Sequence, residues 1–592
     1  MKLHLVFLAS LVAFNLVPAQ EIQWQPWSDS VFSQAKQEGR FVLLDLGTGW
    51  CHWCHVMDNT TYRDPAVADL VRKHYLAVRV DADLRPDLAN LYEDYGWPAT
   101  IVFNVDGSEI VRRRGYIPPK PMASMLENII DDPSPGPSVV PEQKLTNISE
   151  AFLSFDSRDR LRQRLVDTYD SKNKGWGTTQ KFLNWDIIEY CLVEAGHGDT
   201  TFERMGRDTL AAQRNLIDPV WGGVCQYSTD GDWLHPHFEK IMQMQAEDLR
   251  IYAEAFAFWN DPTYLDTAEK IHGYLVHFLR SDDGAFYASQ DADLIPGQHS
   301  ADYYQLSDSE RRKRGLPRID QHVYARENGS AINALATLSA VTSDPRPLDE
   351  ATRAAQWIIA HRGAPDGGFR HDEKDSAGPY LADTLYMGRA FLTLYQATAD
   401  RAWLHRAESA ADYLSAHFTG DVGYITAPNM GMLRSRPQLD ENADLARFTN
   451  LLHYYTGKSI YQQMAEHAMK FLCIPEVQND RGFLIGGILL ANRELTRPPL
   501  HITVVGPKND VAASALFRAA LKAPPSYKRV EWWDSHEGAL PNSDVEYPIL
   551  SDPAAFICTE RDCSAPVFLP DRLVQVVRKN LRLPEGRSPD TD

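Results

Sequence analysis

The chain has 592 residues, of which 44% are hydrophobic and 24% are charged, a composition typical of a globular protein rather than a disordered one. At about 150 residues per domain, this length predicts roughly three or four domains, or fewer if one is a large barrel. The formal net charge of −20 argues against a nucleic-acid-binding protein, because contacts to phosphate need a basic surface.

The first 19 residues have the pattern of a secretory signal peptide. Lys2 gives a positive start, an apolar run extends from Leu3 to Val17, and Ala19 ends a stretch of small residues suited to cleavage. The run is too short to span a bilayer comfortably, and no later stretch reaches 18 apolar residues. We therefore expect a periplasmic or secreted protein with no membrane span after cleavage. The alternative interpretation is an ordinary buried N-terminal helix.

Alternating helix and strand patterns predict an α/β domain over residues 22–132. Apolar runs of strand length alternate with stretches of helical spacing, and an Asp-Gly pair at 106–107 predicts a hairpin turn. In chain order the expected elements are a helix at 30–37, a strand at 41–46, a helix at 56–73, a strand at 76–81, a helix at 87–95, strands at 100–104 and 109–114, and a helix at 121–130.

A Cys-His-Trp-Cys motif, from Cys51 to Cys54, lies between the first strand and the following helix. Disulfide exchange is carried out by a thiolate, and a helix N-terminus lowers the pKa of a thiol placed there. We expect Cys51 to be the exposed attacking sulfur and Cys54, one turn later, to resolve the mixed disulfide. His52 is expected to stabilise the thiolate and to make the pair more oxidising.

The same residues also read Cys-x-x-Cys-His, which is the attachment motif of a c-type haem with His55 as axial ligand. A haem-sized pocket does not fit over a strand-to-helix turn, and a Soret band in purified protein would decide the question. A zinc site is less favoured still, because four ligands within five residues do not easily converge tetrahedrally. We therefore expect no cofactor and no metal.

Three residues in register with the cysteines make this domain resemble thioredoxin. Trp50 directly precedes Cys51, Asp45 lies in the strand where thioredoxins keep a buried acid, and Pro98 lies where they keep a cis-proline facing the cysteines. The resemblance implies a thioredoxin-type site whose partner is a thiol or disulfide protein or an electron donor. A buried Asp45 should have a raised pKa and could move a proton to or from Cys54.

A wider resemblance covers most of the chain. It rests on the segments Cys51–Met57, Gly96–Pro98, Gly175–Gly177, Pro236–Lys240 and Phe286–Asp293. With these motifs the chain is similar to the YyaL family, which is related to the spermatogenesis-associated thioredoxin-like proteins. The resemblance implies a thioredoxin-like domain fused to an (α/α)6 barrel related to six-hairpin glycosidases and sugar epimerases.

Beyond a Pro- and Ser-rich linker at 133–148, residues 149–497 are helical by periodicity. A glycine with aromatic neighbours recurs six times between pairs of predicted helices, at Gly175, Gly222, Gly284, Gly367, Gly423 and Gly482. Six helix pairs with a glycine-rich turn predict an α/α toroid independently of the family resemblance. The expected helices are 149–169, 185–196, 201–217, 240–259, 262–280, 328–342, 348–361, 380–398, 401–418, 442–456 and 458–473.

Aromatic and acidic residues gather at the predicted loop end of this toroid. Aromatic side chains can stack on sugars, and paired carboxylates can hydrolyse glycosides. Residues two apart on an extended segment face the same way, so each of two such pairs is a candidate acid/base pair. The alternative is that these residues only hold loops and cap helices. The candidates are Tyr227, Trp233, His237, Glu239, Asp291, Asp293 and Asp383.

Residues 498–582 predict a small α/β unit, with strands at 501–506, 529–532 and 554–559 and helices at 510–523 and 569–581, followed by a polar tail at 583–592. Cys558 and Cys563 are close enough in sequence to bridge in an oxidising compartment. The basic run from Arg311 to Arg314 is expected to be a solvated surface loop.

The sequence therefore predicts a multidomain protein: a thioredoxin-like α/β domain, an (α/α)6 toroid and a small C-terminal α/β unit. The function expected first is an exported thiol-disulfide oxidoreductase whose barrel binds or positions a substrate. The first alternative is a carbohydrate-active enzyme, a glycoside hydrolase or sugar epimerase, with a regulatory redox domain and a carbohydrate ligand. The second is a binding or scaffold protein without turnover.

Overall fold

The computed structural model describes residues 21–92, 96–139, 145–146, 148–375, 377–428, 431, 433–524, 527–558 and 563–581. The predicted signal peptide at 1–19 and the tail at 583–592 lie outside these residues. The chain divides into two compact units: Met1–Gly47, Trp53–Val80 and Tyr95–Val140 form the first, and Thr48–His52, Asp81–Asp94 and Pro141–Asp592 form the second. Two short segments of the predicted N-terminal domain are therefore grouped with the second unit.

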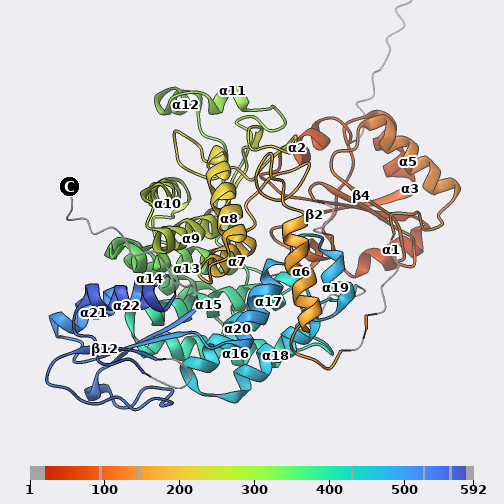
Figure 1. Cartoon of the computed structure of the whole chain (residues 1–592). Coiled ribbons are helices and arrows are strands. Elements are labelled where there is room, and N and C mark those ends of the chain that lie inside the picture. Colours follow the sequence, from red (N-terminus) through yellow and green to blue (C-terminus); the bar gives the residue numbers. More distant parts are fainter. Residues whose placement is uncertain are drawn as a thin grey trace, which may run out of the picture. The chain divides into compact units, whose positions relative to one another are not determined.

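The first unit contains a four-stranded sheet in the order β2-β1-β3-β4 (Figure 1). β3 runs antiparallel to both β1 and β4. The strands form around buried, mainly apolar residues: five in succession are buried in β1, among them Asp45, and all five are buried in β3, among them Thr100. The elements are α1 (Ser30–Glu38), β1 (Phe41–Gly47), α2 (His52–Asn59), α3 (Pro65–His74), β2 (Tyr75–Asp81), β3 (Ala99–Phe103), β4 (Glu109–Arg114) and α5 (Pro119–Asp131).

The single helix predicted at 56–73 is wrong, because the structure has two helices, α2 and α3, separated at residues 60–64. Pro65 is the first residue of α3, and a residue before proline is disfavoured in helical conformation. The Asp64 carboxylate accepts hydrogen bonds from the backbone N–H groups of Ala66 and Val67, which fixes the new helix start. Periodicity continued across this boundary and therefore concealed it.

The second unit contains a closed ring of six helices. Each helix contacts the next along the chain, and the last contacts the first, which closes the ring. The ring helices are α7 (Trp185–Ala195), α9 (Met242–Trp259), α13 (Ala325–Thr342), α15 (Leu381–Thr398), α17 (Leu439–Thr456) and α20 (Gly486–Thr496).

Each ring helix has a partner that contacts it, so the predicted (α/α)6 toroid is confirmed. The helix α20 was not among the eleven helices that the sequence predicted. Five partners follow their ring helix in the chain, whereas α6 contacts α20 and so joins the two ends of the helical region. The partners are α8 (Thr200–Gln213), α10 (Pro262–Tyr274), α14 (Pro345–Arg362), α16 (Arg401–Phe418), α18 (Ser459–Leu472) and α6 (Phe155–Asp167).

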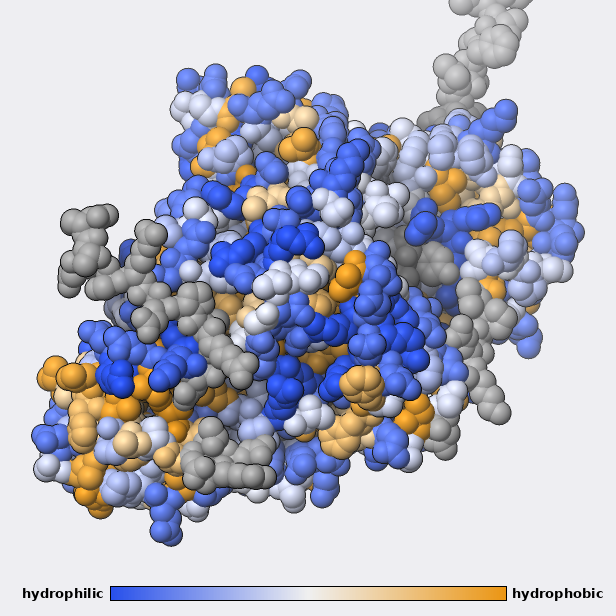
Figure 2. All heavy atoms as spheres, viewed as in Figure 1, coloured by the Kyte–Doolittle hydropathy of each residue, from blue (hydrophilic) through white to orange (hydrophobic). Residues whose placement is uncertain are grey.

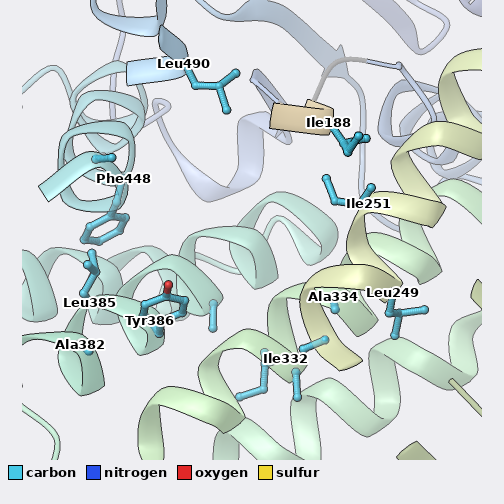
Figure 3. Packing of buried hydrophobic residues seen from close by; sticks show 14 of the residues in the cluster. Ile188, Leu249, Ile251, Ile332, Ala334, Ala382, Leu385, Tyr386, Phe448 and Leu490 are labelled. Carbon is cyan, nitrogen blue, oxygen red and sulfur yellow. The ribbon is translucent and has the colours of Figure 1, made fainter. Parts of the chain in front are cut away.

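Apolar side chains from all six ring helices pack together, as the close view of Ile188, Leu249, Ile332, Leu385 and Leu490 illustrates (Figure 3). Burial of one such side chain contributes about 1.5–3 kcal/mol. Most residues of α13 and α15 are buried, which explains why these helices show weak one-sided patterns in sequence. The ring therefore supplies a rigid support for the loops at its ends.

A glycine allows α13 and α15 to approach closely. A Cβ on Gly329 would lie 2.6 Å from the backbone carbonyl carbon of Tyr386. Gly329→Ala is therefore expected to lower the free energy of unfolding by about 1–3 kcal/mol through overpacking. Gly273→Ala is the matched control, because that helical glycine has nothing within 4 Å, and alanine should stabilise there by about 0.5–1 kcal/mol. Denaturant midpoints of both variants test the contrast, and equal shifts would contradict it.

Short elements connect the helices at one end of the ring. β7 (Lys240–Ile241), β8 (Ser289–Gln290) and β9 (Ile319–Asp320) form an antiparallel sheet, and β5 (Tyr227–Ser228) pairs with β6 (Pro236–His237). The remaining short elements are α4 (Pro86–Tyr92), α11 (Ala301–Tyr304), α12 (Asp308–Arg314), α19 (Pro475–Asp480), the 3₁₀ helices η2 (Arg214–Leu216) and η4 (Ser535–Glu537), and a π-helical turn, η3 (Leu275–Leu279).

The prediction that the basic run 311–314 is a solvated surface loop is only partly right, because Arg312, Lys313 and Arg314 are exposed but belong to a helix. The run ends α12, and Arg311 is fully buried. Its guanidinium bonds to the Asp218 carboxylate at 2.7 Å and to the backbone carbonyl of Leu306 at 3.0 Å. A buried charge is tolerated when it is paired in this way, and the sequence did not indicate the distant partner.

The C-terminal segment forms the predicted small α/β fold within the second unit. Its sheet has the order β11-β10-β12, with β10 parallel to β11 and antiparallel to β12. A disulfide joins Cys558 to Cys563. Hydrophobic side chains are exposed over the region of α21 and β12 (Figure 2). The elements are β10 (Leu500–Val505), α21 (Val511–Leu521), β11 (Lys528–Trp533), β12 (Ala554–Cys558) and α22 (Pro570–Asn580).

Among the described residues, no helix combines the length and the apolar character needed to cross a membrane.

Candidate functional site

Cys51 directly precedes α2, and both Cys51 and Cys54 are disulfide-bonded. Cys51 is only 4% exposed, whereas Cys54 is partly exposed. The expectation that Cys51 is the exposed sulfur is therefore wrong for this disulfide-bonded structure. Its neighbours explain the burial: Arg318 donates to the carbonyl of Gly49 at 2.8 Å, and the N–H of Ala292 donates to the carbonyl of Trp50 at 3.4 Å.

Trp50 is held by an acid that the sequence analysis did not single out. Its indole N–H donates to the Asp83 carboxyl at 2.7 Å. Burial, together with the nearby charge of Asp81, raises the pKa of Asp83 to about 8. Most Asp83 carboxyls are therefore protonated at neutral pH, next to the residue that precedes Cys51.

His52 lies between the cysteines and is paired with Asp293. Its Nδ1 lies 2.9 Å from both carboxylate oxygens of Asp293. The backbone N–H of His52 faces Glu239 Oε1 at 3.4 Å, and its ring lies edge-on to His299 with 5.7 Å between the ring centroids. These four residues all lie in the second unit. The structure thus brings three sequence-predicted residues, His52, Glu239 and Asp293, into one cluster.

Asp45 is buried in β1 as predicted. It accepts a hydrogen bond from the Tyr62 hydroxyl at 3.0 Å and from Arg79 Nε at 2.9 Å. Burial raises the pKa of Asp45 to about 6, although the charge of Arg79 opposes the shift. Asp45 and Gly47 share one face of the strand, and a Cβ on Gly47 would lie 3.1 Å from Cys54 Sγ. The carboxyl group and the second thiol therefore lie on the same face of β1.

Pro98 has a cis peptide bond to Trp97, as the thioredoxin resemblance implied. The register of β1 and β3 pairs Leu46 with Ala99, which places Pro98 at the strand end next to Gly47. The ring of Trp53 stacks on Tyr116, with 5.7 Å between the ring centroids. Within the first unit, the structure therefore places the proline, the acid and Cys54 around the end of β1.

A second clamp in the second unit holds the 81–83 segment. His371 Nε2 donates to the backbone carbonyl of Asp83 at 2.7 Å, and His371 Nδ1 lies 2.9 Å from Asp383 Oδ1. The Asp383 carboxylate also accepts from the backbone N–H of Arg326 at 3.0 Å. The charge of Asp383 raises the pKa of His371 to about 9, despite burial. Asp383 is thus engaged in holding another part of the chain.

The other barrel candidates are only partly brought together. Asp291 accepts a hydrogen bond from the backbone N–H of Asp293 at 2.9 Å, so the Asp291 side chain folds back over the backbone of Asp293. His237 stacks on Tyr227 with 4.3 Å between centroids. Trp233 is buried and donates its indole N–H to backbone carbonyls of the 173–174 turn. Trp233 is therefore a structural residue rather than a sugar platform.

A cleft of about 460 Å³ lies next to the His52 cluster within the second unit. His299 lines it, and the ring of that histidine also contacts His52. Phe238 lines the same cleft and stacks on Tyr304 with 4.2 Å between centroids. The volume of this cleft falls in the range of ligand pockets.

Three residues of the site were missed by sequence analysis: Asp83, His299 and Arg318. Asp83 follows the second strand of the N-terminal domain, a position where polar residues often serve a site. The other two carry no local motif, and their partners are 200 or more residues away in sequence.

Comparisons with known proteins agree with this architecture. A family model described as "Protein of unknown function, DUF255" and named Thioredox_DsbH matches residues 14–131. Spermatogenesis-associated protein 20 of mouse is 27% identical over 310 residues, covering 46% of this chain and 39% of that protein. The human protein of the same name is 22% identical over 586 residues and covers 74% of each chain. In the mouse comparison, the chain thus spans about two fifths of its relative's length.

Two further matches concern single parts of the chain. A thioredoxin H-type from Fagopyrum esculentum is 29% identical over 90 residues, covering 15% of this chain and 71% of that protein. A crystal structure of D-mannose isomerase aligns with a TM-score of 0.45 at 12% identity, over 58% of this chain and 99% of that chain. The N-terminal part of the chain thus matches a thioredoxin-like family model, and much of the chain is similar to spermatogenesis-associated protein 20.

Proposed function

We propose that the protein is an exported thiol-disulfide oxidoreductase that uses Cys51 and Cys54. The observation that carries the proposal is the disulfide-bonded pair at the start of α2, with a buried acid and a cis-proline at the adjoining strand end. A helix N-terminus favours a thiolate at Cys51, and Asp45 has a pKa suited to exchanging a proton near neutral pH.

The reaction proceeds by two exchange steps. A thiolate of a substrate dithiol attacks one sulfur of the Cys51–Cys54 disulfide, which forms a mixed disulfide and releases the other cysteine as a thiolate. The second substrate thiol then attacks the mixed disulfide, so the substrate leaves oxidised and the protein pair is reduced by two electrons. The reverse sequence reduces a substrate disulfide. Asp45 takes or returns the proton of Cys54.

The toroid positions the site and the substrate in this proposal. The 460 Å³ cleft is continuous with the His52 cluster through His299, and it can receive the segment of a substrate that flanks its cysteine. A carbohydrate-active barrel is less favoured because its candidate acids are already engaged. Asp293 pairs with His52, Asp383 pairs with His371, and Glu239 faces the backbone of His52.

Export belongs to the same proposal. The pattern of residues 1–19 and the disulfide between Cys558 and Cys563 both support an oxidising compartment. Fractionation of cells that produce the full chain should place the mature protein in the periplasm or the medium. Recovery in the cytoplasm would contradict this part.

Insulin reduction and substrate trapping test the redox function. We expect the wild type to catalyse dithiol-dependent insulin reduction, and we expect the Cys51→Ser/Cys54→Ser double variant to lose at least about 100-fold, because the exchange chemistry needs both thiols. Cys54→Ser alone should accumulate a mixed disulfide on Cys51.

Cys51→Ser is the matched variant for trapping a mixed disulfide on Cys54, because Cys54 is the more exposed cysteine in this structure. A conjugate on Cys54 rather than on Cys51 would exchange the roles of the two cysteines and leave the function in place. An insulin-reducing activity that is equal in wild type and double variant would overturn the proposal. Glycan or epimerase turnover that survives in the double variant would favour the carbohydrate alternative.

A further inference from the structure

Asp293 is placed by the toroid and not by the strand that precedes the cysteines. It lies in the loop that follows β8, and its carboxylate is almost fully buried, with 2% exposed. Gly297 N–H donates to Asp293 Oδ2 at 2.8 Å, and the N–H of Asp293 itself donates to Asp291 at 2.9 Å. The carboxylate is therefore held by its own loop, independently of His52.

His52 is fixed against this carboxylate from two sides. Its Nδ1 is 2.9 Å from each oxygen of Asp293, and Glu239 Oε1 lies 3.4 Å from its backbone nitrogen. Because a carboxylate accepts hydrogen bonds, the proton of Nδ1 points at Asp293. Other groups around the segment include the His299 ring and the Arg318 guanidinium, which binds the carbonyl of Gly49.

We infer that Asp293 is a positioning residue of the redox site: its carboxylate orients the His52 ring beside Cys51 and supplies a negative partner for that ring. The inference rests on the proposed redox function and deepens it. An isolated imidazolium in a buried site is strongly disfavoured, whereas a paired one is tolerated. A positive ring next to Cys51 stabilises the thiolate and hence the reduced form of the pair.

The consequence is that a loop of the helical toroid sets the redox equilibrium of the Cys51–Cys54 pair. Asp291 and Asp293 resemble a catalytic pair in sequence, but each then has a different structural role. Asp291 shapes the turn, and Asp293 faces the imidazole of His52. This explains why acids gather at the loop end of the toroid without a substrate of their own.

Replacement of Asp293 by asparagine tests the inference. Asp293→Asn keeps the shape and removes the charge, so the reduced form should lose stabilisation. In glutathione redox titrations, the equilibrium between the pair and glutathione should shift about tenfold toward the disulfide, which is about 30 mV for this two-electron couple. The pH midpoint of thiolate absorbance should rise in the same variant.

Asp293→Glu is the conservative variant and should restore most of the wild-type equilibrium, because it returns the carboxylate. Asp302→Asn removes an exposed acid from α11 in the same region and should change nothing. In a His52→Ala background, Asp293→Asn should have no further effect, because Asp293 acts through that ring.

Each result has a separate meaning. If the wild type shows a redox couple and Asp293→Asn leaves both the couple and the thiolate profile unchanged, the inference is overturned and the proposed function stands. An equal shift in the His52→Ala background would also overturn it, because Asp293 would then act directly. If the wild type shows no redox couple, the proposed function itself fails. If Asp293→Asn fails to fold, Asp293→Glu is compared with wild type instead, both with His52 in place and in the His52→Ala background, and that comparison decides.

Discussion

Replacing Arg447 by methionine is expected to lower the free energy of unfolding by about 3–5 kcal/mol, because it leaves buried carboxylates without their cation. Arg447 lies on α17 and contacts Glu189 on α7 and Glu494 on α20, the latter at 3.0 Å through Nε. Both acids are almost fully buried. Burial raises the pKa of Glu494, and Arg447 opposes that shift. The arginine thus joins three helices of the ring by compensating charge.

Glu494 depends more strongly than Glu189 on Arg447 for compensation of its buried charge. Glu189 also accepts a hydrogen bond from Arg250 Nη1 at 2.9 Å. Within the described part of the chain, Glu494 forms its ion pairs with Arg447. The network borders a cavity of about 130 Å³ that is lined by the ring helices and by part of the C-terminal segment, between Leu521 and Lys528. Glu494→Gln in the Arg447→Met background is therefore expected to recover part of the loss, because it removes the uncompensated charge.

Denaturant unfolding of Arg447→Met, the double variant and a matched control measures the effect. Arg312→Met is the control, since Arg312 forms an exposed ion pair with Asp308 on α12 and should cost less than about 1 kcal/mol. Equal losses in Arg447→Met and Arg312→Met would show that the network compensates no buried charge. No recovery in the double variant would show that Glu494 is not the residue left unpaired.

The fold was predictable because its repeats are visible in the chain. Six glycines with aromatic neighbours marked the turns of the helix pairs, and the ring closes as those repeats predict. The boundary at Pro65 was missed because apolar periodicity runs through it. The burial of Arg311 was missed because its partner, Asp218, is 93 residues away. Local patterns report local structure, and such pairings depend on tertiary contacts.

The candidate site was predictable on the strand side and not on the toroid side. Asp45, Pro98 and the cysteines lie at spacings that one α/β fold explains, so their grouping followed from the motif. Asp293 was singled out, but as half of a glycoside-cleaving pair. Its engagement with His52, 241 residues earlier, gives it a different task. Sequence indicated that acids gather at the loop end, and only the structure indicated what they face.

The second large effect concerns His371, whose substitution by asparagine should lower the free energy of unfolding by about 3 kcal/mol at pH 6. Both ring nitrogens face acceptors: Nε2 donates to the carbonyl of Asp83, which can only accept, and Nδ1 faces the Asp383 carboxylate. The pKa of Asp383 is also raised, because burial outweighs the attraction to His371. The two acceptors of the His371 ring together favour its doubly protonated form.

The sign of the pH dependence follows from that raised pKa. The pKa of His371 rises from 6.5 to about 9 on folding, so the folded protein binds the proton more tightly than the unfolded chain. The stabilisation is fully present below about pH 6.5 and is lost as pH rises through about 9. The stability difference between wild type and His371→Asn should therefore shrink progressively between pH 6 and pH 10.

His322→Asn is the matched control, because the His322 side chain is 44% exposed although it also faces a carboxylate, that of Asp320 at 2.5 Å. Its replacement should cost less than about 1 kcal/mol. Unfolding midpoints of the three proteins, measured from pH 6 to pH 10, test the prediction. A His371→Asn deficit that stays constant across this range would mean that the ring contributes through packing alone. The 81–83 segment, and with it Asp83 beneath Trp50, would then be held by shape rather than by a buried charge.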